Sequence, residues 1–142
     1  MAKKRLRKGA VIEKIYHIPP SVFMNTLVKV TDNSGAQIAR VIGVAHKKTV
    51  RRRILGASVG DVVIVSIREG KPELRKQVMK AVVVRQRKPY RRRDGTWIQF
   101  EDNAVVLLTP EGEPRGTEIR GPIAREVAEK WVKLANIASL II

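Results

Sequence analysis

The amino-acid sequence predicts a mainly β protein, a small barrel with a short helical carboxyl-terminal segment. Three observations support this fold class. Short runs rich in β-branched and aromatic residues recur along the chain, turn-forming residues separate them, and no long helical pattern precedes residue 110. Because closing a sheet removes its exposed edges, about five or six such short strands favour a closed barrel.

The first strands are expected at residues 26–31 and 37–44, joined by the turn-forming cluster Asp32-Asn33-Ser34-Gly35. After a basic loop, Gly60 and Asp61 turn the chain into residues 62–67. This almost continuous apolar run is typical of a strand that is buried on both faces. Residues 69–77 form a polar connection, in which Pro72 is well placed to begin one turn of helix.

Three further β-prone runs follow, at residues 78–85, 96–100 and 104–108. The first two are predicted to pair as a hairpin, because Asp94 and Gly95 between them tolerate the backbone angles of tight turns. Six basic residues precede this turn. We therefore expect a stiff hairpin with a cationic tip.

The carboxyl-terminal region begins at a cluster of helix and strand breakers, PEGEP at residues 110–114. Pro122 is placed to start a helix over residues 123–130, and a helical pattern resumes from Val132 to Ala138. One or two short helices should pack on the barrel or on a neighbour, followed by an apolar end. The expected regions are a basic N-terminal arm and lead-in at residues 1–25, the barrel at 26–109, and the carboxyl-terminal loop and helices at 110–142.

Charge is distributed unevenly. The 142 residues include 29 Lys and Arg against 13 Asp and Glu, a formal net charge of +16 at pH 7. Residues 1–110 hold 24 basic and 8 acidic residues, whereas residues 111–142 hold 5 of each. The basic part is expected to bind phosphate, and the neutral part suits protein contacts. Nucleic acid fits this excess better than an anionic membrane does, because the basic residues cluster in loops rather than along an amphipathic helix.

The sequence also indicates where in the cell the protein is expected. No apolar run approaches the roughly 20 residues needed to cross a bilayer, and no signal-peptide pattern opens the chain. The chain contains no Cys, which agrees with a reducing environment and removes disulfide and zinc-ribbon scaffolds. We therefore expect a cytoplasmic protein.

Three basic clusters are the candidate RNA-binding sites. Their like charges repel one another, and the repulsion is relieved when phosphates displace condensed counterions. A solvated basic loop is the plain alternative for each cluster, and simple disorder for the first. The clusters are Lys3, Lys4, Arg5, Arg7 and Lys8 in the N-terminal arm; Lys47, Lys48, Arg51, Arg52 and Arg53 in the middle loop; and Arg85, Arg87, Lys88, Tyr90, Arg91, Arg92 and Arg93 in the hairpin.

Aromatic residues make up only 4% of the chain, which favours folded, phosphate-dense RNA over the stacking of single-stranded bases. Tyr90 either stacks on a base or packs against arginine stems. Trp97 and Phe100 are three positions apart, so a regular strand places them on opposite faces, and one of them is expected in the core.

No catalytic group stands out. His17 and His46 lie among apolar or basic neighbours, without the carboxylate or second ligand that a general base or a metal site needs. Glu101 and Asp102 are adjacent, so on a strand they would point to opposite faces, and Asp102 suits a turn. The glycines form no phosphate-cradling motif. The sequence therefore predicts no enzyme, no cofactor and no metal.

Four segments are distinctive: VTDNSGA at residues 30–36, GDVVIVSI at 60–67, KAVVVRQRKPYRRRDGTWIQFEDNAVVL at 80–107 and GEPRGTEIRGPIARE at 112–126. Together they resemble the universal large-subunit ribosomal protein number fourteen family, over nearly the whole chain from about residue 27 onward. GKPELRKQVMKAVVVRQ at residues 70–86 and the basic amino end resemble its archaeal and eukaryotic branch.

This resemblance implies a five-stranded β-barrel with a short helical carboxyl end, on the intersubunit face of the large ribosomal subunit. It implies binding to large-subunit rRNA through basic loops, contacts with neighbouring ribosomal proteins, a bridge to small-subunit rRNA, and docking of an anti-association factor. The residues that match the bridge and partner region are Arg115, Gly116, Thr117, Glu118, Ile119 and Arg120. The alternative function is a free-standing nucleic-acid-binding barrel, such as an architectural DNA protein.

Overall fold

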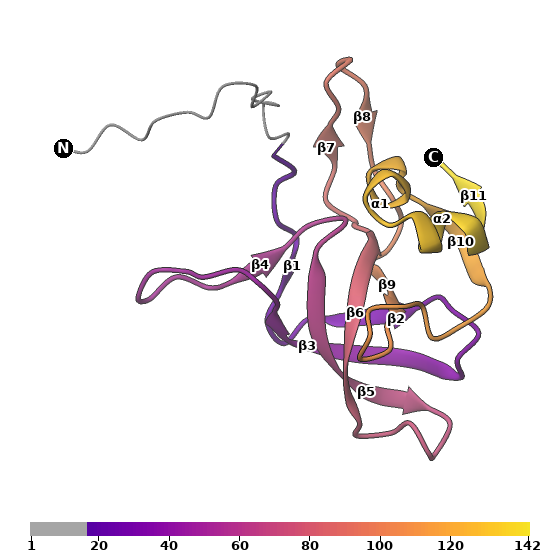
Figure 1. Cartoon of the computed structure of the whole chain (residues 1–142). Helices are drawn as coiled ribbons and strands as arrows, with labels where there is room; N and C mark the ends of the chain where they lie inside the picture. The colour runs from indigo at the N-terminus through magenta and orange to yellow at the C-terminus, as the bar shows by residue number, and fades with distance from the viewer. Residues whose placement is uncertain (1–16) are drawn as a thin grey trace, which may run out of the picture.

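Five strands close into a barrel in the order β2-β3-β5-β6-β9, in a computed structural model that describes residues 17–142 (Figure 1). The parallel pairing of β2 with β9 closes the barrel, and the other neighbouring strands pair antiparallel. The predicted five-stranded barrel is therefore confirmed. The strands are β2 (Leu27–Val30), β3 (Ala36–Val44), β5 (Val62–Gly70), β6 (Val78–Arg85) and β9 (Ala104–Leu107).

Small β-branched side chains fill the interior of the barrel. Along β5, Val63, Val65 and Ile67 are fully buried, whereas the residues between them are only half-buried. Inward and outward positions alternate along a barrel strand, so only one face of β5 points into the core. The expectation that this strand is buried on both faces was wrong.

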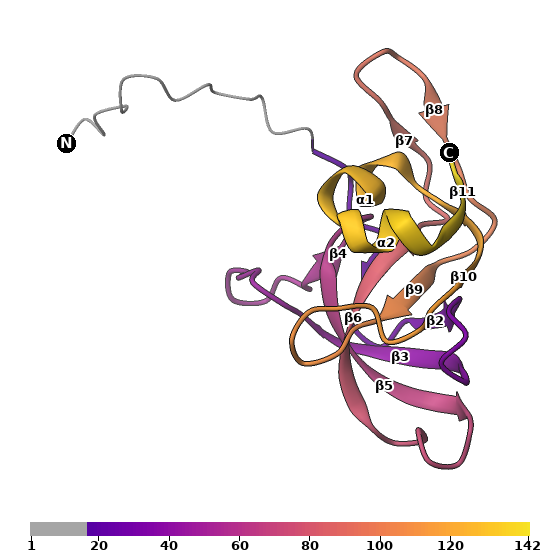
Figure 2. The same cartoon turned by 45° about the vertical axis from the view of Figure 1, so that its right-hand side comes forward.

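The strands that are buried on both faces are β9 and the second half of β6. Ala81 and Val83 point into the barrel, and Val82 and Val84 belong to a second core on its outer side. Figures 1 and 2 show the carboxyl-terminal helices packed beside this face of the barrel. The second core joins the barrel to residues 111–142, and its fully buried members from that part are Ile119, Ile123, Ala124, Val127 and Leu134.

Two short helices form the carboxyl-terminal cap, as predicted. They are α1 (Arg125–Lys130) and α2 (Val132–Ile137), and Trp131 lies between them. Pro122 does not begin a helix, because it lies in β10 (Ile119–Ile123), which pairs in parallel with β11 (Ala138–Ile141). The sequence did not indicate this pair, since Gly and Pro inside β10 are residues that strands usually exclude.

The predicted hairpin between residues 78–85 and 96–100 was wrong in its pairing. Both edges of β6 are already paired, with β5 and β9. The hairpin forms instead between β7 (Tyr90–Arg91) and β8 (Trp97–Ile98), and it projects away from the barrel (Figures 1 and 2). We call residues 90–98 the cationic hairpin.

The turn of the cationic hairpin is the one that the sequence predicted. The Arg92 amide donates to the Thr96 carbonyl at 2.8 Å, and Gly95 has a φ of +90°. The Asp94 carboxylate accepts the Thr96 amide at 2.9 Å, and this bond lowers the pKa of Asp94. Below the turn, Phe100 is buried in the second core and Trp97 is exposed, so one of the two aromatic residues is in the core, as expected.

A second projection leaves the barrel between β3 and the short strand β4 (Gly56–Ala57), which pairs with β1 (Val22–Phe23). Figure 1 shows this segment as a long loop that extends to one side of the barrel. We call residues 46–55 the basic loop. The connection from β5 to β6 is formed by hydrogen-bonded turns at residues 72–76, and the Arg75 amide donates to the Lys71 carbonyl at 3.3 Å, so one helical turn begins at Pro72.

Asp32 holds the first hairpin onto the barrel. Its carboxylate accepts the Ser34 amide at 3.1 Å, within the turn between β2 and β3, and the Leu107 amide of β9 at 3.0 Å. The residue is only 4% exposed. A buried carboxylate with amide donors on both sides fixes the turn against the neighbouring strand.

We predict that Asp32→Ala destabilises the fold by about 2–3 kcal/mol, because it leaves the buried Leu107 N–H without an acceptor. Urea-induced unfolding would measure the change. Glu101→Ala is the matched control, since Glu101 is exposed, and its effect should stay within about 0.5 kcal/mol. Equal effects of the two substitutions would contradict the role assigned to Asp32.

Candidate nucleic-acid interface

The basic loop presents its cations to solvent. The five basic side chains of the middle cluster all belong to exposed residues: Lys47, Lys48, Arg51, Arg52 and Arg53. His46 and Arg52 have positive φ angles of 59° and 67°, which mark sharp bends of the backbone at the start and at the far end of the loop. The structure therefore brings these predicted site residues together on one projection.

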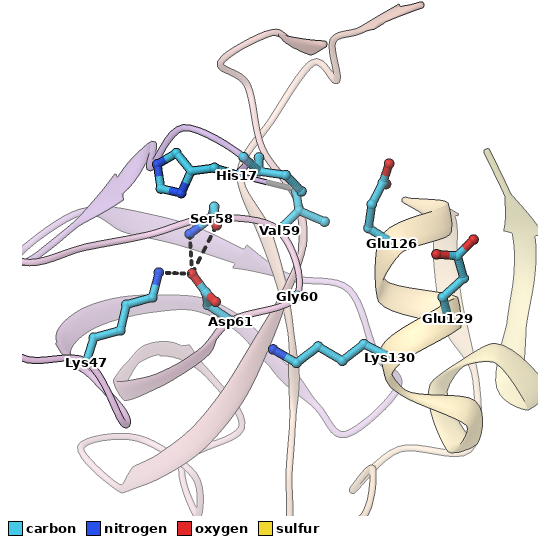
Figure 3. Close-up of a pocket in the computed structure, with 10 residues that line it drawn as sticks. His17, Lys47, Ser58, Val59, Gly60, Asp61, Glu126, Glu129 and Lys130 are labelled. Atoms are coloured by element: carbon cyan, nitrogen blue, oxygen red, sulfur yellow. Dashed lines mark hydrogen bonds and ion pairs between the residues drawn. The ribbon is translucent and has the colours of Figure 1, made fainter. Parts of the chain in front are cut away.

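Lys47 is held at the base of this loop. Its ammonium pairs with the Asp61 carboxylate, which also accepts the Ser58 amide at 2.8 Å and the Ser58 hydroxyl at 3.0 Å. Figure 3 shows Lys47, Ser58 and Asp61 gathered at this point. The ion pair fixes the root of the loop, and the four other basic residues lie beyond it.

The three consecutive arginines of the cationic hairpin differ in exposure. Arg91 and Arg93 are exposed, whereas the Arg92 side chain is 11% exposed and lies against α1. Its guanidinium donates to the Glu126 carboxylate, with Nε 2.8 Å from Oε1 and Nη2 3.3 Å from Oε2. Arg92 therefore points inward between two outward neighbours.

Tyr90 is fully buried in the second core. Its hydroxyl donates to Oε2 of Glu126 at 2.8 Å. Burial, followed by the neighbouring Glu126 carboxylate, raises the pKa of Tyr90 well above its ordinary value. A ring in this position is closed to nucleic-acid bases, so the structure does not support the stacking role considered for Tyr90.

Arg85 is an internal clamp. Nε and Nη2 of its guanidinium donate to the two carboxylate oxygens of Asp102 at 2.9 and 3.1 Å. Its Nη1 donates to the carbonyls of Arg120 and Pro122 at 3.2 and 3.0 Å. The bidentate pair ties β6 to the turn before β9, and the two Nη1 bonds tie it to β10. Together they leave little of the guanidinium for phosphate.

Arg85, Tyr90 and Arg92 are thus corrected from RNA-contact candidates to internal residues. The sequence concealed their role, because their acidic partners Asp102 and Glu126 lie 17 and more than 30 positions away. Arg87 and Lys88 are exposed between β6 and β7. The N-terminal candidates Lys3, Lys4, Arg5, Arg7 and Lys8 lie outside the described residues.

The bridge candidates form one continuous segment, residues 115–120, that is exposed in part. Four of them are exposed, whereas Gly116 and Ile119 are buried. Ile119 therefore contributes to the second core and not to an outer surface. The exposed members are Arg115, Thr117, Glu118 and Arg120.

Asn33, which the sequence did not mark as a site residue, holds this segment in place. Its side-chain Oδ1 accepts the Thr117 amide at 2.8 Å, and its Nδ2 donates to the Thr117 hydroxyl at 2.8 Å. The Arg120 amide donates to the Thr31 carbonyl at 2.7 Å. The turn between β2 and β3 therefore supports residues 115–120 along their length. No signal within the sequence pairs Asn33 with Thr117, 84 positions away.

An open cavity of about 620 Å³ lies between the root of the basic loop and α1 (Figure 3). Its ionisable lining residues are His17, Lys47, Asp61, Glu126, Glu129 and Lys130. Asp61 and Glu126 are already engaged by Lys47 and Arg92. Within residues 17–142, no three His, Cys, Asp or Glu side chains gather as a metal site would require.

The surface chemistry of the described residues is therefore that of a binding protein, with two exposed basic projections on a rigid β scaffold. No helix within this part of the chain is both long enough and apolar enough to span a membrane. Exposed Arg and Lys on ordered loops are suited to contact phosphates at fixed separations.

Residues 21–142 match the family model for ribosomal protein L14p/L23e. The protein is thus of the ribosomal class, and the chain belongs to the L14p/L23e family. Membership in this family confirms the resemblance seen in the sequence and the expectation of a structural, non-enzymatic protein.

Individual relatives agree with this assignment. Over 125 residues, 88% of this chain and 89% of the relative, the chain is 70% identical to the large ribosomal subunit protein uL14 of Thermofilum pendens. It is 57% identical to the protein of that name from Pyrobaculum aerophilum, over the full length of both chains. The corresponding protein of Sulfurisphaera tokodaii is 58% identical over 88% of this chain and 91% of its own.

We predict that Gly116→Ala destabilises the protein by about 1–3 kcal/mol and displaces residues 115–120, because the added Cβ would lie 2.6 Å from Oδ1 of Asn33. Chemical denaturation would measure the stability, and amide exchange at Thr117 the displacement. Gly43→Ala is the control, since a Cβ there would have no neighbour nearer than 3.9 Å. A Gly116→Ala variant as stable as the control would argue against the close packing on Asn33.

Proposed function

We propose that this chain is a structural constituent of the large ribosomal subunit in the cytoplasm, and that it binds large-subunit rRNA through its basic projections. The observation that supports this most directly is the pair of exposed cationic projections on a closed barrel, in a chain of the L14p/L23e family. Relatives at 54–70% identity bear the name of a large ribosomal subunit protein. The role is architectural, since the barrel holds the cations and the RNA supplies the anionic surface.

The proposed rRNA contacts follow the exposed cations. The tip of the basic loop supplies guanidinium and ammonium groups beyond the Lys47–Asp61 pair, and the cationic hairpin supplies a second group. Each phosphate contact releases condensed counterions, so binding should weaken steeply as salt rises. The described residues of this set are Lys48, Arg51, Arg52, Arg53, Arg87, Lys88, Arg91 and Arg93, to which the N-terminal arm is added from the sequence.

The carboxyl-terminal side is proposed to contact small-subunit rRNA and protein partners. Arg115 and Arg120 are exposed on a backbone that the first turn supports, which suits a bridge to small-subunit rRNA. Glu118 lies between them, and its carboxylate would face an anti-association factor more favourably than it would face phosphate. The apolar side chains of Leu140, Ile141 and Ile142 are about half exposed, and they suit contact with a neighbouring ribosomal protein.

We predict that replacing Arg51 and Arg53 together by Ala lowers affinity for large-subunit rRNA. The dependence of log Kd on log salt should also fall, by about one unit for each phosphate that the variant no longer neutralises. The barrel should stay folded, because both residues are exposed on a loop. Filter binding at several salt concentrations would measure the affinity and the slope.

The matched control removes the same charge from the neutral end of the chain, as Lys130→Ala with Lys133→Ala, two exposed residues. Equal weakening of binding in both double variants would mean that net charge alone drives binding. Duplex DNA of the same length tests the free-standing architectural alternative, which predicts comparable affinity for DNA and RNA. Retention in the large-subunit fraction of a native lysate after a high-salt wash would favour the ribosomal function.

We also predict that Arg115→Ala with Arg120→Ala weakens the joining of large and small subunits while leaving incorporation into the large subunit unchanged. Both side chains are exposed, and their backbone is held by Asn33 and Thr31. Gradient sedimentation of mixed subunits at graded magnesium would measure the joining. Loss of incorporation would instead place this segment against the large subunit itself.

A further inference from the structure

The cationic hairpin is connected to the barrel only through its ends and its side chains. Strands β7 and β8 form their own two-stranded sheet, separate from the closed barrel. Such a ribbon is marginally stable in water when nothing packs against it. Its direction must therefore be set by the contacts of its side chains.

The side chain that receives these contacts is Glu126, at the second position of α1. One oxygen accepts the Tyr90 hydroxyl at 2.8 Å, and the other accepts Nε of Arg92 at 2.8 Å. Arg92 also donates through Nη2 to the Ile142 carbonyl at 2.6 Å. One carboxylate thus binds both the first strand of the hairpin and the start of its turn.

The packing around Glu126 favours a strong interaction. The side chains of Arg92 and Glu126 are 11% and 19% exposed, and Tyr90 beside them is fully buried. Partial burial strengthens a charge-assisted hydrogen bond, and the planar guanidinium fits the carboxylate along two of its N–H groups. Two nearby carboxylates, Asp94 in the hairpin turn and Glu129 on the same helix, belong to exposed residues.

We propose that Glu126 is the positioning residue of the cationic hairpin. It draws Arg92 inward and anchors Tyr90, so that the hairpin is held in one direction before RNA binds. This inference rests on the proposed rRNA-binding function and assigns to α1, a neutral part of the chain, a part in RNA binding. Pre-ordering matters because a hairpin that is already fixed loses less conformational entropy on docking.

The expected effect of Glu126→Gln on RNA affinity is opposite to that of net charge alone. Removing a negative charge from a protein that binds RNA ordinarily strengthens binding. Glu126→Gln should instead weaken binding to large-subunit rRNA, by roughly three- to tenfold, because the hairpin is no longer held by the ion pair. Amide exchange of residues 91–97 in the free protein should become faster, while exchange in the barrel strands stays unchanged.

Glu129→Gln is the matched control. Glu129 is exposed on the same helix and lines the same cavity (Figure 3), and the substitution removes the same charge. Its affinity for rRNA should equal or slightly exceed that of the wild type, with unchanged exchange in the hairpin. A double-mutant cycle adds Arg92→Gln. If Glu126 acts through Arg92, the double variant should bind as weakly as either single variant, not more weakly.

The outcomes separate the possible roles. Tighter binding by Glu126→Gln would mean that Glu126 restrains Arg92 from phosphate, and it would overturn the proposal. Faster exchange with unchanged affinity would also overturn it, since the hairpin's direction would then be irrelevant to RNA. If Glu126→Gln does not fold, Arg92→Gln breaks the same ion pair from the hairpin side and must show faster exchange of residues 91–97 together with lower affinity, since the lost positive charge alone would change only the affinity.

If the chain does not bind large-subunit rRNA at all, a different set of results is expected. In that case the wild-type protein would show no preference for large-subunit rRNA over duplex DNA, and the Arg51 and Arg53 variant would behave as its control does. The exchange measurement, which uses no RNA, would still report whether Glu126 fixes the hairpin.

Discussion

The parallel pairing of β2 with β9 is the interaction on which the rest of the structure depends. Lys29 lies opposite Ala104 and Val30 opposite Val105, and these contacts convert a curved sheet into a closed one. Closure leaves no free barrel edge and fixes the points at which the chain leaves the barrel. The basic loop leaves after β3, and the path to the cationic hairpin leaves after β6. The spacing of the two positive projections is therefore a property of the barrel.

A carboxylate holds each projection to the scaffold. Asp61 pairs with Lys47 at the root of the basic loop, and Glu126 pairs with Arg92 at the start of the turn of the cationic hairpin. In a chain with 29 basic residues, these few acids determine which cations are structural and which face outward. Without these acids the cations would repel one another within each projection, whereas the two ion pairs leave the repulsion among the exposed cations, where a polyanion relieves it.

The sequence predicted those features that depend on local patterns. The barrel class, the turn at Asp94 and Gly95, the exposed basic loop and the two short helices all follow from residue types within a few positions of one another. The features that it did not predict depend on distant partners. The placement of Arg85 inside the protein depends on Asp102, and the support of Thr117 depends on Asn33. The β10–β11 pair was missed because Gly121 and Pro122 are unusual in strands and because the partner strand begins at Ala138, well beyond β10.

The second core has a consequence for how the protein is made. All the barrel strands are complete by Leu107, whereas part of the second core around Val82 and Val84 comes later, from Ile119 onward. During synthesis a closed barrel can thus exist with a partly uncovered apolar surface along β6. Exposed apolar surface of this kind promotes aggregation in incomplete chains. The helical end therefore protects the barrel, and a nascent chain that stops before it would be a natural client for chaperones.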